Sequence, residues 1–180
     1  MNIFITYGLF DGPLFGRALR RELLRRGHTI AMSPSEADLV IAHSGAWCML
    51  DQSYHYNKLV LVDPAYRDET SVWVKSLRRL GYDARHLKWH ELPRYVYRRS
   101  LNLWYLVTRF NYWLRMKKRY DILDIVPLIS RPNTCVLEAS DPAWHNRTII
   151  QRAEQPIRTL QGDHDSIWHK PDKLAALLDL

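Results

Sequence analysis

Short, uninterrupted apolar runs separated by helix-forming stretches are the feature that most constrains the fold. Strands buried on both faces of a sheet have this pattern, and helices between them are the crossovers that parallel strands require. The sequence therefore predicts an α/β protein with a mostly parallel, doubly wound sheet of about six strands. The runs are N-I-F-I-T (2–6), H-T-I-A-M (28–32), A-D-L-V-I-A (37–42), K-L-V-L-V (58–62), T-C-V-L-E-A (134–139) and P-I-R-T-L (156–160).

The segments between these runs carry helix signals. In the first one, Asp11 is suited to cap a helix, Pro13 to its first turn and Gly27 to the left-handed position after its end. Phe15, Leu19 and Leu23 then form one apolar stripe along it. Further helices are predicted directly after Ser44, around 144–153, and at the C-terminal end of the chain over 172–180.

The middle of the chain departs from this alternation in both length and charge. Residues 67–130 hold 14 Lys and Arg against 6 Asp and Glu, and 11 of the 21 aromatic residues, in a chain of net charge +7. Helices are predicted over 71–81 and 99–120. Because about 65 residues exceed what a crossover needs, we interpret 67–131 as a helical cap inserted into a core made of 1–66 and 132–180, all within one structural domain.

Several classes of protein are disfavoured by composition. No apolar run approaches the roughly 20 residues of a membrane span, and the first residues lack the pattern of a secretion signal. Cys48 and Cys135 have no metal-ligand spacing and are expected to be reduced thiols. These observations predict a cytoplasmic protein that uses no metal and no cofactor.

Chemistry-bearing residues follow four of the predicted strands. In parallel sheets, sites form beyond the carboxyl ends of the strands, so these residues are expected to meet at one edge. Together they offer backbone donors, a hydroxyl, a carboxylate and an imidazole, the groups that acyl transfer needs. They lie in the segments G-L-F (8–10), H-S-G (43–45), E-A-S-D (138–141) and G-D-H-D (162–165).

These segments resemble the motifs of the α/β-hydrolase superfamily, and most closely those of compact serine hydrolases that lack the first two strands of the full fold. A-H-S-G-A (42–46) resembles the nucleophile elbow G-x-S-x-G, with Ala42 and Ala46 in place of its two glycines. V-L-E-A-S-D-P-A-W resembles the acid-bearing turn, and L-Q-G-D-H-D-S-I-W-H-K-P the histidine loop. The resemblance covers 1–66 and 132–180, and the serine, acid and histidine have the superfamily's chain order.

The resemblance implies a role for each site residue. Ser44 would be the nucleophile, His164 the general base and Asp141 the acid that orients it, while Asp63 is the alternative acid because it also follows a strand. The N–H groups of Gly45 and Leu9 would form the oxyanion hole, with Phe10 as the alternative to Leu9. His43 is expected to pack behind the site, outside the triad.

The implied activity is hydrolysis of an ester or thioester of a small to medium acyl or aryl substrate, as by a carboxylesterase or thioesterase. One alternative is a binding module with the same fold and weak or no catalysis, which uses the basic aromatic cap as its partner surface. Weak contact of that cap with a polyanion or a membrane surface is the partner prediction beyond the substrate. A second alternative is a nucleoside deoxyribosyltransferase-like enzyme, which M-N-I-F-I-T-Y-G-L-F also resembles, but it leaves G-D-H-D unexplained.

Overall fold

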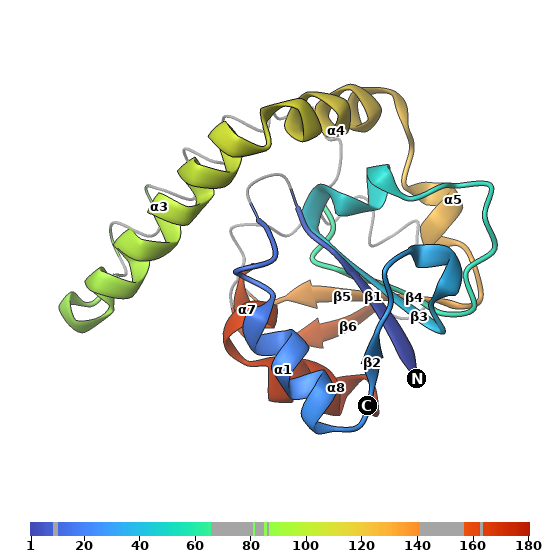
Figure 1. Ribbon diagram of the computed structural model, residues 1–180, viewed down its shortest axis with the longest axis horizontal. Helices are drawn as coiled ribbons and strands as arrows, with labels where there is room; N and C mark the ends of the chain where they lie inside the picture. The colour runs from blue at the N-terminus through green and yellow to red at the C-terminus, as the bar shows by residue number, and fades with distance from the viewer. Residues whose placement is uncertain (9–10, 66–80, 82–84, 86, 141–156, 163) are drawn as a thin grey trace.

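Six parallel strands form one sheet in the order β2-β1-β3-β4-β5-β6, which confirms the predicted α/β class and parallel sheet. The computed structural model describes the whole chain except residues 9–10, 66–80, 82–84, 86, 141–156 and 163 (Figure 1). Each strand lies within a predicted apolar run or extends it by one residue. The strands are β1 (Asn2–Thr6), β2 (Thr29–Ile30), β3 (Leu39–His43), β4 (Leu59–Val62), β5 (Thr134–Ala139) and β6 (Ile157–Leu160).

Helices cover both faces of the sheet. On one side lie α1 (Arg17–Arg25), α7 (Ser166–His169) and α8 (Pro171–Leu177), which pack on one another in Figure 1. The other side holds the 3₁₀ helix η2 (Ser44–Met49), α4 (Phe110–Ile122) and α5 (Val126–Ile129). Three further elements complete the described chain: η1 (Pro34–Glu36), η3 (Trp89–Glu91) and the long helix α3 (Leu92–Thr108), which projects away from the sheet in Figure 1.

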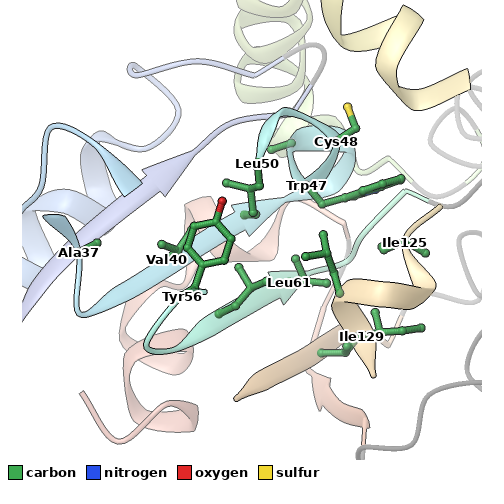
Figure 2. Close-up of a cluster of buried hydrophobic side chains, with 14 of the residues drawn as sticks. Ala37, Val40, Trp47, Cys48, Leu50, Tyr56, Leu61, Ile125 and Ile129 are labelled. Atoms are coloured by element: carbon green, nitrogen blue, oxygen red, sulfur yellow. The ribbon is translucent and has the colours of Figure 1, made fainter. Parts of the chain in front are cut away.

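Alternate residues of the same strands feed two separate hydrophobic clusters. Leu39 and Ile41 of β3 pack with Leu19 and Leu23 of α1, all fully buried. Their neighbour Val40 faces the opposite cluster. In Figure 2, Val40 and Leu61 of the sheet lie beside Trp47 and Leu50, with Ile125 and Ile129 of the α5 segment next to them. Two-sided burial is why the strands read as unbroken apolar runs.

The first helix is shorter than predicted. It begins at Arg17 with Gly16 before it and no capping side chain, so Asp11 does not cap it and Pro13 does not lie in its first turn. Residues 12–16 form turns instead, and a Cβ on Gly12 would lie 2.4 Å from the Tyr105 ring. The carboxylate of Asp11 is engaged elsewhere, as described below. Gly27 does take the left-handed conformation predicted for it, with φ of 82°.

The predicted helix over 99–120 is two helices. α3 begins earlier, at Leu92, and ends before Arg109, whose φ of −118° and ψ of 29° interrupt the helix. The Arg109 guanidinium lies over the Tyr112 ring and donates to the carbonyl of Asp11 at 3.5 Å. These tertiary contacts at the break are invisible to sequence periodicity. The helices predicted at 144–153 and over most of 71–81 lie outside the described residues.

The helical segment contacts the chain after β1 and the helix η2. Tyr105 of α3 is buried and accepts a hydrogen bond from the N–H of Leu14 at 2.9 Å. The hydroxyl of Tyr112 donates to the carbonyl of Tyr7 at 3.4 Å, and α4 packs on η2, where the thiol of Cys48 donates to the carbonyl of Met116. No described helix is long and apolar enough to cross a membrane. The boundaries 67–131 stay a prediction.

Candidate active site

Ser44 stands at the turn between β3 and η2, with its backbone in the left-handed region at φ of 55°. This conformation is unfavourable for a residue with a side chain and tends to occur at functional sites. Gly8 lies against it, since a Cβ on Gly8 would be only 2.9 Å from the Cβ of Ser44. A strand, a residue in left-handed backbone and a helix follow one another in the same order in the nucleophile elbow that A-H-S-G-A resembles.

The two alanines of the elbow are accommodated in the core. Ala42 and Ala46 are both fully buried, and both pack in the cluster that contains Trp47. The helix after the serine is a 3₁₀ helix rather than an α-helix, with its second residue, Gly45, also buried. The turn at Ser44 is therefore formed with a methyl group at each position where the elbow motif has a glycine.

An imidazole and a carboxylate meet beside this turn. Nδ1 of His164, on the loop after β6, is hydrogen-bonded to Oδ2 of Asp63, directly after β4. The side chains of His164 and Asp63 are 12% and 10% exposed. β5 holds the carboxylate in place: Ala139 N–H donates to its Oδ1 at 3.4 Å, and the N–H of Asp63 donates to the carbonyl of Leu137 at 2.6 Å.

Burial and charge act on this pair in opposite directions. Burial alone lowers the pKa of His164, but the Asp63 carboxylate outweighs it, with help from Asp165 and Asp11, and raises the pKa to about 9. Burial likewise tends to raise the pKa of Asp63, but the neighbouring His164 and His43 hold it below its usual value. Asp63 is therefore a carboxylate at neutral pH, positioned to fix the orientation of His164 and stabilise its protonated form.

A second imidazole–carboxylate pair lies next to the first and is more deeply buried. His43, the residue before Ser44, is completely buried, and its Nδ1 lies 2.7 Å from Oδ2 of Asp11. Its Nε2 lies 2.8 Å from the backbone carbonyl oxygen of His164. The two imidazole rings are 4.5 Å apart between centroids. The residue next to the serine thus holds the main chain of the residue that pairs with Asp63.

The two hydrogen-bond partners of His43 limit how many protons the His43–Asp11 pair shares. A carbonyl oxygen only accepts, so Nε2 carries a hydrogen. The contact at Nδ1 then requires either an imidazolium facing an Asp11 carboxylate or a neutral ring facing a protonated Asp11. Either arrangement is electrically neutral overall, which keeps the cost of burial low.

Aromatic and basic side chains enclose the two pairs. Trp168 of α7 meets His43 edge-on at 5.0 Å and stacks on Tyr7 at 5.5 Å, both measured between ring centroids. From the cap side, Arg98 of α3 forms an ion pair with Asp165, the residue after His164. Two contacts therefore hold the histidine loop: His43 binds the backbone carbonyl of His164, and Arg98 of α3 pairs with Asp165.

The donor set does not fit a metal site. Ligand atoms of His43, His164 and Asp165 lie within 4.8 Å of one another. However, both nitrogens of His43 are engaged, by Asp11 and by the carbonyl of His164, and Asp165 is paired with Arg98. Binding an ion there would break a buried pair and an ion pair at once.

The structure brings together only part of the predicted site. Ser44, Gly45, His164 and the alternative acid Asp63 lie at the carboxyl edge of the sheet, whereas Asp141, Leu9 and Phe10 lie outside the described residues. His43 lies behind the site, as expected, but has the specific partners just described. The sequence signal for Asp63 was its place directly after a predicted strand, and the structure adds that this strand, β4, pairs with β3, which ends at the residue before Ser44.

Comparisons with known proteins agree on the fold. No protein-family model and no curated protein sequence matches the chain. Solved structures do match over nearly its whole length. An α/β-hydrolase enzyme, MGS-MChE2, from a sediment metagenome of the Mar Chica lagoon in Morocco has a TM-score of 0.56 at 10% identity, covering 99% of this chain and 88% of its own.

Two bacterial proteins are similar to a comparable degree. The N-formylmaleamic acid deformylase Nfo of Pseudomonas putida S16 has a TM-score of 0.59 at 13% identity, with 98% of this chain and 91% of that one covered. An extracellular α/β-hydrolase from a Paenibacillus species has a TM-score of 0.54 at 13% identity, with coverages of 99% and 97%. The chain is thus an α/β protein built on an all-parallel sheet. More specifically, it has the α/β-hydrolase fold that its motifs resemble.

Proposed function

We propose that the chain is a serine hydrolase that cleaves an ester or thioester of a small to medium acyl or aryl substrate. The observation that carries the proposal is the His164–Asp63 pair at the carboxyl edge of the sheet, with the His164 ring 4.5 Å from that of His43, whose next residue, Ser44, has strained left-handed backbone. An oriented imidazole is what activates a serine hydroxyl for nucleophilic attack, and strained backbone tends to occur at functional sites.

In the proposed reaction, Ser44 Oγ attacks the carbonyl carbon while Nε2 of His164 takes its proton. The tetrahedral intermediate collapses when the histidine returns that proton to the leaving alcohol or thiol, which leaves the acyl group on Ser44. Water, deprotonated by His164, then attacks the acyl-enzyme, and the acid is released when the histidine returns this proton to Ser44 Oγ. The N–H of Gly45 is one oxyanion donor, and the second comes from the loop after β1, where the motif has Leu9 or Phe10.

Asp63 takes the role of the orienting acid in this proposal. Its carboxylate accepts the hydrogen on Nδ1 of His164, which directs the Nε2 edge of the ring away from Asp63. Asp141 stays the competing acid. The preference for an acyl or aryl group rests on the aromatic side chains that border the loop after β1, among them Tyr105 and Tyr112.

Labelling with a fluorophosphonate probe tests the nucleophile. We expect wild type to be labelled and Ser44→Ala to be unlabelled, because the probe reacts only with an activated serine. Ser35→Ala, which removes an exposed hydroxyl in η1, is the matched control and should label like wild type. If folded wild type is not labelled, the chain is a binding module with a hydrolase fold, and the catalytic proposal is wrong.

A further inference from the structure

Helix α3 carries an apolar stripe on its outer side. Leu92, Val96, Leu103 and Val107 follow the spacing of one helix face and are 36% to 67% exposed. Phe110 and Leu114 continue the exposed apolar surface at the start of α4. We call these six residues the outer stripe. In a helix that served only to cover the core, such residues would point inward.

The opposite side of the same helix is the one attached to the core. Tyr105 is buried there and bonds the N–H of Leu14, while Arg98 pairs with Asp165. At about 100° per residue, Leu103 and Tyr105 point in nearly opposite directions. The outer stripe therefore faces away from the sheet, consistent with the projection of α3 in Figure 1. Within the described part of the chain, core packing does not account for it.

Charge limits the kind of partner that could cover this stripe. Residues 92–122 contain eight Lys and Arg and one acidic residue, a net charge of +7 that equals that of the entire chain. A second copy of the same segment would be repelled by this charge. A nucleic acid would match the charge but leave the aliphatic side chains without a partner. A surface that combines negative charge with an apolar interior satisfies both.

We propose that the outer stripe binds the surface of a bilayer that contains anionic lipids. The helix would lie parallel to the surface, with Leu103 and Val107 inserted to the acyl boundary. Trp104 and Tyr97 lie beside the stripe and are 60% and 61% exposed, at the headgroup level that such rings prefer. Exposed Arg115 and Lys118 of α4 would meet the anionic headgroups.

This binding mode is distinct from spanning a membrane. The 17 residues of α3 are about 25 Å long, less than the hydrocarbon thickness, and they include Arg94, Arg98 and Arg99. The inference also goes beyond hydrolysis, because it uses no residue of the proposed triad. Ser44→Ala should bind vesicles as wild type does, so failure of one proposal leaves the other intact.

Co-sedimentation of the full chain with vesicles tests the proposal. We expect binding to vesicles of phosphatidylcholine with one-third phosphatidylglycerol, weaker binding at high salt, and little binding to phosphatidylcholine alone. Leu103→Ser/Val107→Ser should lower the partition coefficient by about tenfold or more, because less apolar surface is inserted. Arg115→Gln/Lys118→Gln should lower it by a similar factor of roughly ten, and only on anionic vesicles.

The matched control makes the same kind of substitution, exposed apolar residue to serine, outside the cap. Leu24→Ser/Met32→Ser removes two exposed apolar side chains outside the cap, and its vesicle binding should equal that of wild type. Unchanged melting temperatures establish that all variants are folded. The proposal is overturned if anionic vesicles are not bound, if the control loses as much binding, or if Leu103→Ser/Val107→Ser abolishes a dimer instead. Displacement from vesicles by single-stranded RNA at equal phosphate concentration would also overturn it in favour of a nucleic acid.

Discussion

Two neighbouring imidazole–carboxylate pairs in this molecule differ in how deeply they are buried and in the elements that carry them. In the outer pair, the side chains of His164 and Asp63 are 12% and 10% exposed, and the histidine comes from a loop. In the inner pair, His43 is completely buried and belongs to the central strand β3. The same chemical groups are thus placed once at the edge of the sheet and once within its packing.

Under the proposed function, this difference assigns the outer pair to the reaction and the inner pair to the structure. The inner ring uses both nitrogens, one on Asp11 and one on the carbonyl of His164, so it has no nitrogen left for proton transfer. The outer ring is held at Nδ1 by Asp63, and the proposed reaction uses its Nε2. Access, rather than residue type, distinguishes the two histidines.

The largest expected contrast is between the two histidines themselves. His164→Gln should lower kcat/KM by roughly 10⁴-fold or more, because the base is lost. His43→Gln should lower it by about tenfold, because only the support of the histidine loop is weakened. Ester hydrolysis by both variants, with circular dichroism to establish folding, makes the measurement. Equal losses in two folded variants would contradict the division of roles.

The next prediction separates the two acids. Asp63→Asn should lower kcat by roughly 10²- to 10⁴-fold, because an amide cannot stabilise the protonated His164. Asp141→Asn should leave it nearly unchanged. Steady-state kinetics on the same ester, with burst amplitude as a second readout, distinguishes them. The reverse result would restore Asp141 as the acid and reduce Asp63 to a structural neighbour.

The inner pair should dominate stability where the outer pair dominates catalysis. His43→Leu leaves the Asp11 carboxyl group buried without its partner, and the free energy of unfolding should fall by about 3 kcal/mol. His43→Leu/Asp11→Asn should recover most of this loss, because no charge is left uncompensated. Urea unfolding measures both values. A double variant as unstable as the single one would show that the pair is not what the stability depends on.

The smallest expected effect is a pH dependence specific to the outer pair. A base must be deprotonated, so kcat/KM should rise with pH up to the His164 pKa of about 9. Because this pKa is raised above its unfolded value, the stability that the pair contributes is complete below about pH 6.5 and is lost as pH rises through about 9. In Asp63→Asn the activity profile should move to lower pH, whereas in Asp11→Asn it should move less.

Much of the sheet could be predicted from sequence because strands that are buried on both faces consist of unbroken apolar runs. β5 is predicted to the residue, and β4 differs by one. Helix limits were harder, since they depend on tertiary contacts. Arg109 interrupts the long helix where it stacks on Tyr112 and reaches Asp11, and no local pattern marks such a position.

The places of candidate site residues were predictable where one motif marks one position, and less so where two strands offer an acid. Ser44 and His164 follow from the elbow and the G-D-H-D loop. The choice between Asp63 and Asp141 needs the order of strands in the sheet, because each follows a strand and precedes a proline. The Asp11–His43 contact joins residues 32 positions apart, and Asp11 looked instead like a helix cap.

The left-handed backbone at Ser44 influences which substitutions the protein can accept at position 44 during evolution. Glycine adopts that conformation without the steric cost that a serine bears, and asparagine tolerates it better than most residues. A descendant lineage that no longer needed the hydroxyl would therefore gain folding stability by discarding it. A serine with this backbone conformation lowers the stability of the fold. Once the hydroxyl is no longer used, position 44 is therefore expected to be among the first to be substituted.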